Sequence, residues 1–252
     1  MRQLRLIRQQ QDFVAAVSHE LKTPLTSIRM YSEMLREGWV TDDKRPAYCR
    51  FIHDESERLS RLVTNVLQLA RMSRDARPLE PRPVTLADLI GQARPALVMQ
   101  AEQAEQAEQA EQAGFELNIE CDGDRGVRAD PDAVTQILIN LVDNAIKFSA
   151  KAERKCIEIG CGMPQKGRVH LWVRDFGAGI PSGERQRVFR LFHRLENEPT
   201  RETKGTGIGL ALAQRLADAM GVGVEVIGRE PGTEVRLTLP AVSLAQMNVN
   251  RP

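Results

Sequence analysis

The stretch VAAVSHELKTPLTSI, from Val14 to Ile28, decides the first part of the fold. Its apolar residues recur at helical spacing, which predicts a helix with one apolar seam that packs against other helices. We expect this helix to run from about Leu4 to Glu37, with Gly38 as its stop. The residues of the seam, four of them seven apart, are Val14, Val17, Leu21, Leu25, Ile28 and Leu35.

His19 lies off that seam, about 140° from Val14 at ~100° per residue, so we expect it to face solvent. Glu20 follows it directly, and Thr23 and Pro24 come one turn later. A proline inside a helix removes a hydrogen bond to the carbonyl one turn back, here that of Glu20, and bends the helix. Taken alone, an exposed histidine of this kind is most often an ordinary surface residue.

A second amphipathic helix is predicted further on, with Thr41, Asp42 and Asp43 as candidate caps before it. Two such helices bury too little apolar surface by themselves. A homodimer that forms a four-helix bundle solves this problem, so we expect the chain to dimerise. The apolar positions of the second helix are Phe51, Ile52, Leu59, Leu62, Val63, Val66 and Leu69.

Composition excludes several classes of protein. The 252 residues carry a formal net charge of +1, so no general attraction to nucleic acid or anionic membrane is expected. No apolar run approaches the ~20 residues that span a bilayer, and no signal peptide opens the chain. The four cysteines, Cys49, Cys121, Cys156 and Cys161, show no CxxC spacing. We therefore expect reduced thiols rather than a disulfide or a metal site.

The segment RPLEPRPV, from Arg77 to Val84, predicts a linker because it holds three prolines in a short polar stretch. The predicted division is 1–76 for the helical hairpin, 77–84 for the linker, 85–242 for a second domain and 243–252 for a tail. Helices and strands mix in the second domain, which predicts an α+β sandwich. Its expected helices are a first one from about 86, then 132–148 and 208–220, and its strands are 115–121, 156–161, 169–175, 224–228 and 234–239.

The tripeptide AEQ occurs four times between Ala101 and Gln112. All three residues favour helix. A period of three drifts about 60° per repeat around a helix, so no fixed apolar face results. We expect a solvated helical extension that ends at Gly114 and has no specific function, with a partner-docking helix as the alternative.

The predicted helix ILINLVDNAIKFS, from Ile137 to Ser149, places Asn140, Asn144 and Lys147 on one face. Amide oxygens suit Mg²⁺, and a lysine suits phosphate as a point charge. A magnesium and phosphate site is one reading of this face, and an ordinary solvated polar face is the other.

The segment DFGAGIP, from Asp175 to Pro181, follows a predicted strand. A carboxylate at a strand end can accept a hydrogen bond from the amino group of a purine, and Gly177 and Gly179 would let the backbone approach the ring. A plain β-turn is the alternative. Asp-Phe-Gly also occurs in protein kinases, but the chain has neither a VAIK-type strand nor an HRD loop.

The segment KGTGIGL runs from Lys204 to Leu210 and opens a predicted helix. Its glycines, Gly205, Gly207 and Gly209, would expose backbone N–H groups to an anion at the helix N-terminus. The polar stretch 195–203 before it reads as a lid over a nucleotide. Phe189 and Phe192 are either the base of that lid or ordinary core residues.

With these motifs the chain resembles the sensor histidine kinases of two-component systems, over about Leu4 to Pro240. SHELKTPL resembles the phosphoacceptor H-box, NLVDNAIKF the N-box, DFGAGIP the first glycine box, VFRLFHR the F-box and GTGIGL the second glycine box. Each motif alone is weak, whereas the order and spacing of all five are specific. The resemblance implies a dimeric helical hairpin followed by a Bergerat-type α/β sandwich.

The resemblance also implies roles for single residues. His19 would accept the γ-phosphoryl group of ATP, Glu20 would orient the imidazole or take its proton, and Thr23 would place water for dephosphorylating a partner. The ATP-binding set would comprise Asn140 and Asn144 as Mg²⁺ ligands, Lys147 at phosphate, Asp175 at adenine, and Gly177, Gly179, Lys204, Gly205, Thr206, Gly207 and Gly209 around the nucleotide. Two features depart from the family pattern: the AEQ repeat, and a thin final glycine box at Gly232 and Thr233.

The predicted function is that of an ATP- and Mg²⁺-dependent, homodimeric histidine autokinase. It would pass phosphate to an aspartate of a response regulator receiver domain, with dephosphorylation of that regulator as a second activity. We expect no nucleic acid and no direct membrane contact. The expected location is the cytoplasm, as a soluble kinase or as part of a membrane-bound sensor. Two alternatives stay open: a scaffold that binds ATP without transfer, and an ATPase of the chaperone or topoisomerase type.

Overall fold

The computed structural model describes residues 2–74, 79–107, 115–121, 125–165, 167–191, 193, 195 and 207–243. The chain divides into two compact units, 1–76 and 77–252. Each unit is described by itself.

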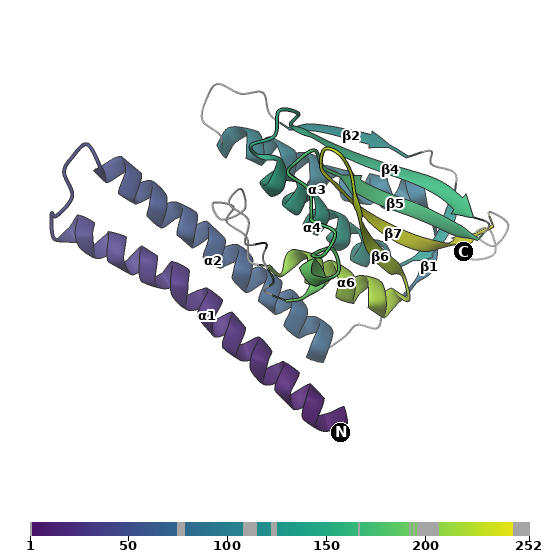
Figure 1. The fold of residues 1–252 in the computed structure, drawn as a ribbon, viewed down its shortest axis with the longest axis horizontal. Coiled ribbons are helices and arrows are strands. Elements are labelled where there is room, and N and C mark those ends of the chain that lie inside the picture. The colour runs from purple at the N-terminus through teal and green to yellow at the C-terminus, as the bar shows by residue number, and fades with distance from the viewer. Residues whose placement is uncertain are drawn as a thin grey trace. The chain divides into compact units, whose positions relative to one another are not determined.

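The first unit is a helical hairpin of α1 (Arg2–Arg36) and α2 (Arg45–Arg74), which lie side by side (Figure 1). The two predicted helices are therefore confirmed, and α1 continues through Pro24. Gly38 follows α1 with a φ of +69°, a left-handed conformation that favours glycine at this position. Near the turn the helices pack through aromatic rings, with Tyr31 stacked on Phe51 at 5.3 Å between centroids.

The second unit contains a mixed sheet. Among the described residues seven strands join in the order β1-β3-β7-β5-β4-β2, and β6 also pairs with β7 (Figure 1). All neighbours are antiparallel except β2 and β4, which are parallel. The strands are β1 (Arg82–Thr85), β2 (Glu116–Glu120), β3 (Gly126–Ala129), β4 (Cys156–Gln165), β5 (Arg168–Arg174), β6 (Gly223–Gly228) and β7 (Thr233–Val242).

Three helices, α3 (Leu86–Ala107), α4 (Pro131–Ser149) and α6 (Gly209–Met220), cover one face of this sheet, and the short helix η1 spans Arg187–Phe189 (Figure 1). Strand β5 shows how the core forms, because Val169, Leu171 and Val173 alternate with more exposed residues and are buried. Burying each such side chain contributes about 1.5–3 kcal/mol. The predicted sandwich of helices on a sheet is confirmed.

Two strands were not predicted. The proposed linker is wrong over Arg82–Val84, which lie in β1 and pair with β3. Pro83 is tolerated there because β1 is an edge strand, where a missing N–H costs no ladder bond. Strand β3 is only four residues long and lacks clear alternation, so the sequence offered no signal for it.

The expectation of four reduced thiols is also wrong, because a disulfide joins Cys121 to Cys161 across a sequence separation of 40. Strands β2 and β4 pair in parallel with Glu120 opposite Gly160, and this register brings the next residue of each strand together. Spacing along the chain could not reveal a register between distant strands. Cys49 and Cys156 are free thiols.

The start of the AEQ repeat, Ala101 to Ala107, continues α3. The remainder of the repeat and the predicted end at Gly114 lie outside the described residues. No helix in the described part of the chain has the length and apolarity to span a membrane.

Candidate functional site

Helix α4 carries the predicted polar face, and its sequence sets where that face points. Asp130 caps the helix, since its Oδ1 accepts hydrogen bonds from the backbone N–H groups of Asp132 (3.0 Å) and Ala133 (3.1 Å). Pro131 occupies the first turn, where no hydrogen bond is lost. The apolar stripe that fixes the rotation of the helix is buried: Val134, Ile137, Leu138, Leu141, Val142 and Ala145.

Asn140 and Asn144 meet the start of α6. The Nδ2 of Asn140 donates to the carbonyl of Gln136 at 3.0 Å, and the Nδ2 of Asn144 is buried with no hydrogen-bond partner in the described part of the chain. A Cβ added to Gly209 would come within 3.3 Å of Asn144 Nδ2 and 3.9 Å of Asn140 Oδ1. The structure therefore brings the two predicted asparagines against a glycine of the later motif, and a side chain at position 209 would crowd them.

Lys147 forms an ion pair with Asp143, one helical turn earlier. Both side chains are partly exposed. Asp143 was missed in the sequence, although its i, i+4 spacing to Lys147 is the pattern of a helical ion pair. The lysine is thereby held near Asn144 on α4.

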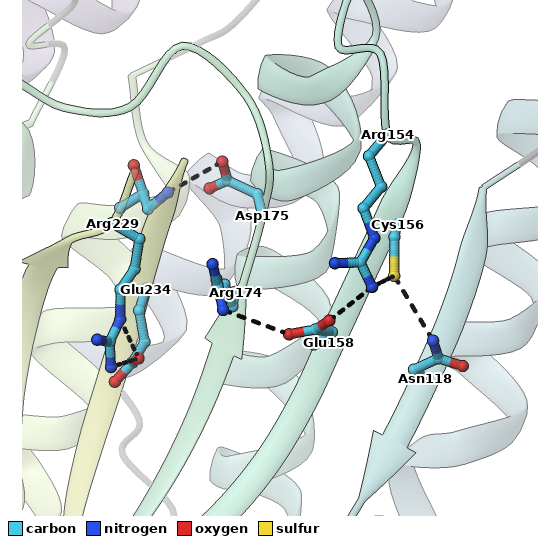
Figure 2. A network of polar contacts seen from close by, with 9 residues as sticks. Asn118, Arg154, Cys156, Glu158, Arg174, Asp175, Arg229 and Glu234 are labelled. Atoms are coloured by element: carbon cyan, nitrogen blue, oxygen red, sulfur yellow. Dashed lines mark hydrogen bonds and ion pairs between the residues drawn. The ribbon is translucent and has the colours of Figure 1, made fainter. Parts of the chain in front are cut away.

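Asp175 follows the last residue of β5 and is tied to the start of β7 (Figure 2). Its Oδ1 accepts from the N–H groups of Gly177 (2.9 Å) and Thr233 (3.2 Å), and its own N–H donates to the carbonyl of Thr233 at 2.8 Å. Burial raises the pKa of the Asp175 carboxyl from 3.8 to about 6, although these two hydrogen bonds and the charge of Arg174 oppose the rise. Among the described residues no hydrogen bond uses the second oxygen, Oδ2.

The turn after Asp175 has no room for side chains at its glycines. A Cβ on Gly177 would lie 2.3 Å from the carbonyl oxygen of Phe148, next to Lys147 on α4. A Cβ on Gly232 would lie 1.9 Å from the carbonyl oxygen of Asp175. The thin final glycine box at Gly232 and Thr233 is thus the element that holds Asp175, a role the sequence alone did not suggest.

In the helical unit, Glu20 on α1 faces Arg58 on α2. The Nη2 of Arg58 lies 3.5 Å from Glu20 Oε2, and its Nη1 lies 3.5 Å from Oε2 of Glu55. The Nε of Arg58 is buried, and no described residue is a hydrogen-bond partner for it. Arg58 was not predicted as a site residue, because nothing in the sequence shows which residue of the second helix lies opposite Glu20.

Other predicted residues are placed only in part. Thr23 is exposed on α1, while the side chain of His19 lies outside the described residues, so its solvent exposure stays a prediction. Lys204, Gly205, Thr206 and Phe192 also lie outside them, as does the predicted lid apart from Leu195. Gly207 precedes α6 with a φ of +65°, and Gly179 has a φ of +76°. Phe189 is buried, as expected of a core residue.

The residues present fit a magnesium nucleotide. Two neutral amides on one helix face supply oxygen ligands of the kind that Mg²⁺ takes. The buried Nδ2 of Asn144 is a donor that finds no acceptor among the described residues, and a phosphate oxygen is an acceptor of the kind that such a group calls for. The N-terminus of α6 beside it offers backbone N–H groups to an anion.

Two protein families match the chain. The His Kinase A (phospho-acceptor) domain matches residues 9–75, and the histidine kinase-, DNA gyrase B- and HSP90-like ATPase matches residues 129–243. The fold and the site thus define a protein that joins a phosphoacceptor hairpin to an ATPase domain of this type.

Known proteins of similar sequence support the same assignment. The chain is 32% identical over 240 residues to the sensor histidine kinase WalK of Bacillus subtilis (strain 168), which covers 94% of this chain and 38% of WalK. A WalK sensor protein kinase of Staphylococcus aureus is 30% identical over 235 residues, covering 92% of this chain and 54% of that protein. The chain belongs to the sensor histidine kinases of two-component systems, a family of protein-histidine kinases. It spans only about a third to a half of the length of these relatives.

Solved structures show the same fold. Histidine kinase ThkA in complex with the response regulator protein TrrA matches with a TM-score of 0.72 and 24% identity, over 96% of this chain and 64% of that one. Full-length ShkA in complex with AMPPNP matches with a TM-score of 0.58 and 27% identity, over 92% of this chain and 46% of that one.

Proposed function

We propose that this chain is an ATP-dependent histidine autokinase whose phosphoacceptor is His19. The observation that carries the proposal is the meeting of α4, α6 and the Asp175 turn in one place. There, the unpartnered Asn144 amide lies beside Gly209, and Gly177 packs against the α4 backbone. A nucleotide suits this combination because it needs one acceptor for a purine amino group and several donors for phosphate. The complex of ShkA with AMPPNP agrees with it.

Asp175 is proposed to recognise adenine. Its Oδ1 is already engaged by the N–H groups of Gly177 and Thr233, so Oδ2 is the acceptor for the purine amino group. An ionised carboxylate accepts more strongly than a neutral one. With a pKa of about 6, Asp175 is mostly ionised at pH 7 and gives up this advantage in acid.

Asn140 and Asn144 are the proposed magnesium ligands. The ion, when bound, neutralises phosphate charge as it builds up during phosphoryl transfer. Lys147 is proposed to turn from Asp143 to the phosphates, because an exposed part of its side chain lets it exchange partners. Gly177, Gly179, Gly207 and Gly209, together with Lys204, Gly205 and Thr206, would let the backbone close around the nucleotide.

The transfer step makes one bond and breaks one bond. A lone-pair nitrogen of the neutral His19 imidazole attacks the γ-phosphorus, the bond to the β–γ bridging oxygen breaks, and ADP leaves with the electron pair. The second ring nitrogen then loses its proton, and Glu20 is the neighbouring carboxylate that accepts it. Arg58 opposite Glu20 helps to hold that carboxylate in place. Catalysis here rests on placement and charge rather than on further covalent chemistry.

The next acceptor is proposed to be an aspartate of a response regulator, since the P–N bond of phosphohistidine is labile. Thr23, exposed on α1 one turn beyond His19, is proposed to place water for the reverse reaction, the dephosphorylation of that regulator. ThkA, which shares this fold, was crystallised with a response regulator protein. We further propose that the chain acts in the cytoplasm, as a homodimer through its helical hairpin.

The decisive experiment compares His19→Gln with His53→Gln, a matched control that removes an exposed histidine from α2. Each full chain is incubated with γ-labelled ATP and Mg²⁺, and acid-labile, base-stable label is measured beside nucleotide affinity. We expect His19→Gln to lose all label while binding ATP normally, and His53→Gln to keep both. Label that persists in His19→Gln places the phosphoacceptor elsewhere. Nucleotide binding without label in the wild type favours an ATP-binding scaffold, and steady ATP turnover without label favours a simple ATPase.

A further inference from the structure

Phe176, the middle residue of the Asp175–Gly177 turn, is held by two arginines. The guanidinium carbon of Arg154 lies 4.0 Å from the centroid of its ring, and that of Arg174 lies 4.6 Å away. Phe176 is buried, with 7% of its surface exposed. Both distances fall within the range of cation–π attraction, which grows when the cation is desolvated.

Glu158 joins the two arginines (Figure 2). Its Oε1 lies 2.9 Å from Arg154 Nη2, and its Oε2 lies 3.7 Å from Arg174 Nη1. Glu158 and Arg174 are cross-strand partners in the β4–β5 ladder, so the sheet itself sets this pair. Arg154 comes from the connection between α4 and β4, and its Nη2 also approaches the sulfur of Cys156 at 3.7 Å.

We call Arg154, Glu158 and Arg174 the arginine clamp. Stability alone does not explain the clamp well, because the Nε of Arg174 is buried and has no hydrogen-bond partner among the residues that the structure describes. A buried donor that lacks an acceptor destabilises the folded chain. An apolar side chain in place of the arginines would cover the Phe176 ring without leaving a donor unsatisfied. The arginines therefore point to a role of the clamp in the Asp175–Gly177 turn.

The backbone of that turn is anchored on two other sides. Gly177 packs against the carbonyl of Phe148 on α4, and Asp175 is bonded to Thr233 at the start of β7. The Phe176 ring is the third anchor, and the clamp holds it from the β4 side. Together the three anchors restrain the turn that carries the Asp175 carboxyl.

We propose that Arg154 and Arg174, bridged by Glu158, are positioning residues that hold the Phe176 ring and thereby set the Asp175 carboxyl toward the purine of ATP. This inference rests on the proposed function, since it assumes that Asp175 binds adenine. Arg174 has a second effect, because burial raises the pKa of the adjacent Asp175 carboxyl and the charge of Arg174 opposes part of that rise. Among the described residues, the groups that hydrogen-bond to this carboxyl are the backbone N–H groups of Gly177 and Thr233, which do not titrate.

The test measures ATP affinity of the full chain by calorimetry between pH 5 and pH 8. The variants are Arg154→Met and Arg174→Met, with Arg168→Met, an exposed arginine of β5, as the matched control. We expect each clamp variant to weaken ATP binding by about threefold to tenfold, and the control to leave it unchanged. Only Arg174→Met should also raise the pH below which ATP affinity falls. A purely structural role would not produce that shift.

A double-mutant cycle with Phe176→Leu shows whether the arginines act through the ring. In that background, Arg154→Met should cause no further loss. If Phe176→Leu fails to fold, Phe176→Tyr replaces it, and there the arginine losses should persist. Wild-type affinity in either arginine variant, full additivity with Phe176→Leu, or an unmoved pH profile for Arg174→Met overturns the proposal.

The outcomes for the clamp and for the proposed function are distinct. A wild-type chain that binds no ATP, or an Asp175→Asn variant that binds it normally, overturns both. A wild type that binds ATP and an Asp175→Asn variant that does not, combined with unaffected clamp variants, overturns only the clamp.

Discussion

At the scale of single residues, the proposed role of Asp175 in nucleotide binding comes at the expense of stability. Its carboxyl has a pKa raised from 3.8 to about 6 by burial, so the folded chain resists ionising a group that the unfolded chain ionises readily. Folding stability therefore falls as pH rises from about 4 to 6, and the cost stays constant above that window. The ionised form is the one proposed to accept the purine amino group.

This conflict predicts the behaviour of Asp175→Asn. The amide can still accept from Gly177 and Thr233, so the variant without nucleotide should be more stable than the wild type above pH 6. The gain should be at most about 3 kcal/mol, since each pKa unit is worth about 1.4 kcal/mol. It should vanish below about pH 4. Urea unfolding across pH measures it, with exposed Asp218→Asn as the control, and calorimetry should show lost ATP binding. A variant that is less stable at pH 8 would contradict this account.

At the scale of elements, one helix or strand supplies a site residue, and a neighbouring element supplies the side chain that holds it. Glu20 on α1 meets Arg58 on α2, and both side chains are largely buried, at 22% and 13% exposed. A partly buried pair is screened less by salt than a surface pair. Arg58 thus restrains the carboxylate next to His19, the proposed phosphoacceptor.

We expect Arg58→Ala to lower the rate constant of His19 autophosphorylation by about tenfold, a fraction of the roughly 10²–10⁴ that a positioned general base contributes. The KM for ATP should not change, because the nucleotide residues belong to the other unit. Arg58→Lys should recover part of the rate. Single-turnover labelling measures the effect, with exposed Arg50→Ala on the same helix as the control. A change in KM alone would argue against a role at Glu20.

The disulfide between β2 and β4 is a second contact between elements. It closes a loop of 40 residues, and constraining the unfolded chain in this way is worth about 4 kcal/mol. Reductant should therefore lower the free energy of unfolding of the wild type by that order. Cys161→Ser should be insensitive to reductant, whereas Cys49→Ser should behave like the wild type. Thiol counting in denaturant is the direct check, and four free thiols before reduction would refute the bond.

At the scale of the whole molecule, the helical hairpin leaves apolar side chains uncovered. Leu25 is 57% exposed on α1, and Leu67 is 50% exposed on α2. Exposed apolar surface on paired helices is the feature that a four-helix bundle of two copies would bury. The exposure of Leu25 and Leu67 therefore supports the proposed homodimer.

We expect Leu67→Glu to shift the chain from dimer to monomer, because a charge at a bundle interface is costly to desolvate. The matched control is Met99→Glu, which changes an apolar residue 53% exposed on α3 of the second unit and should leave the dimer intact. Light scattering over a range of concentrations reports both. A Leu67→Glu chain that stays dimeric would place the interface elsewhere.

Local pattern was enough for much of this molecule. Apolar spacing placed α1, α2 and α4, helical spacing put Asn140 and Asn144 on one face, and a carboxylate at a strand end marked Asp175, because side-chain period and strand-end chemistry act within a few residues. The short strands β1 and β3, the Cys121–Cys161 bond, and the partners Arg58, Thr233 and Arg174 were not predictable. Each depends on which distant segments lie side by side. Strand register and packing between elements decide which segments lie side by side, and only the tertiary structure shows them. The sequence by itself contains the motifs, whereas the fold provides the contacts that orient their side chains.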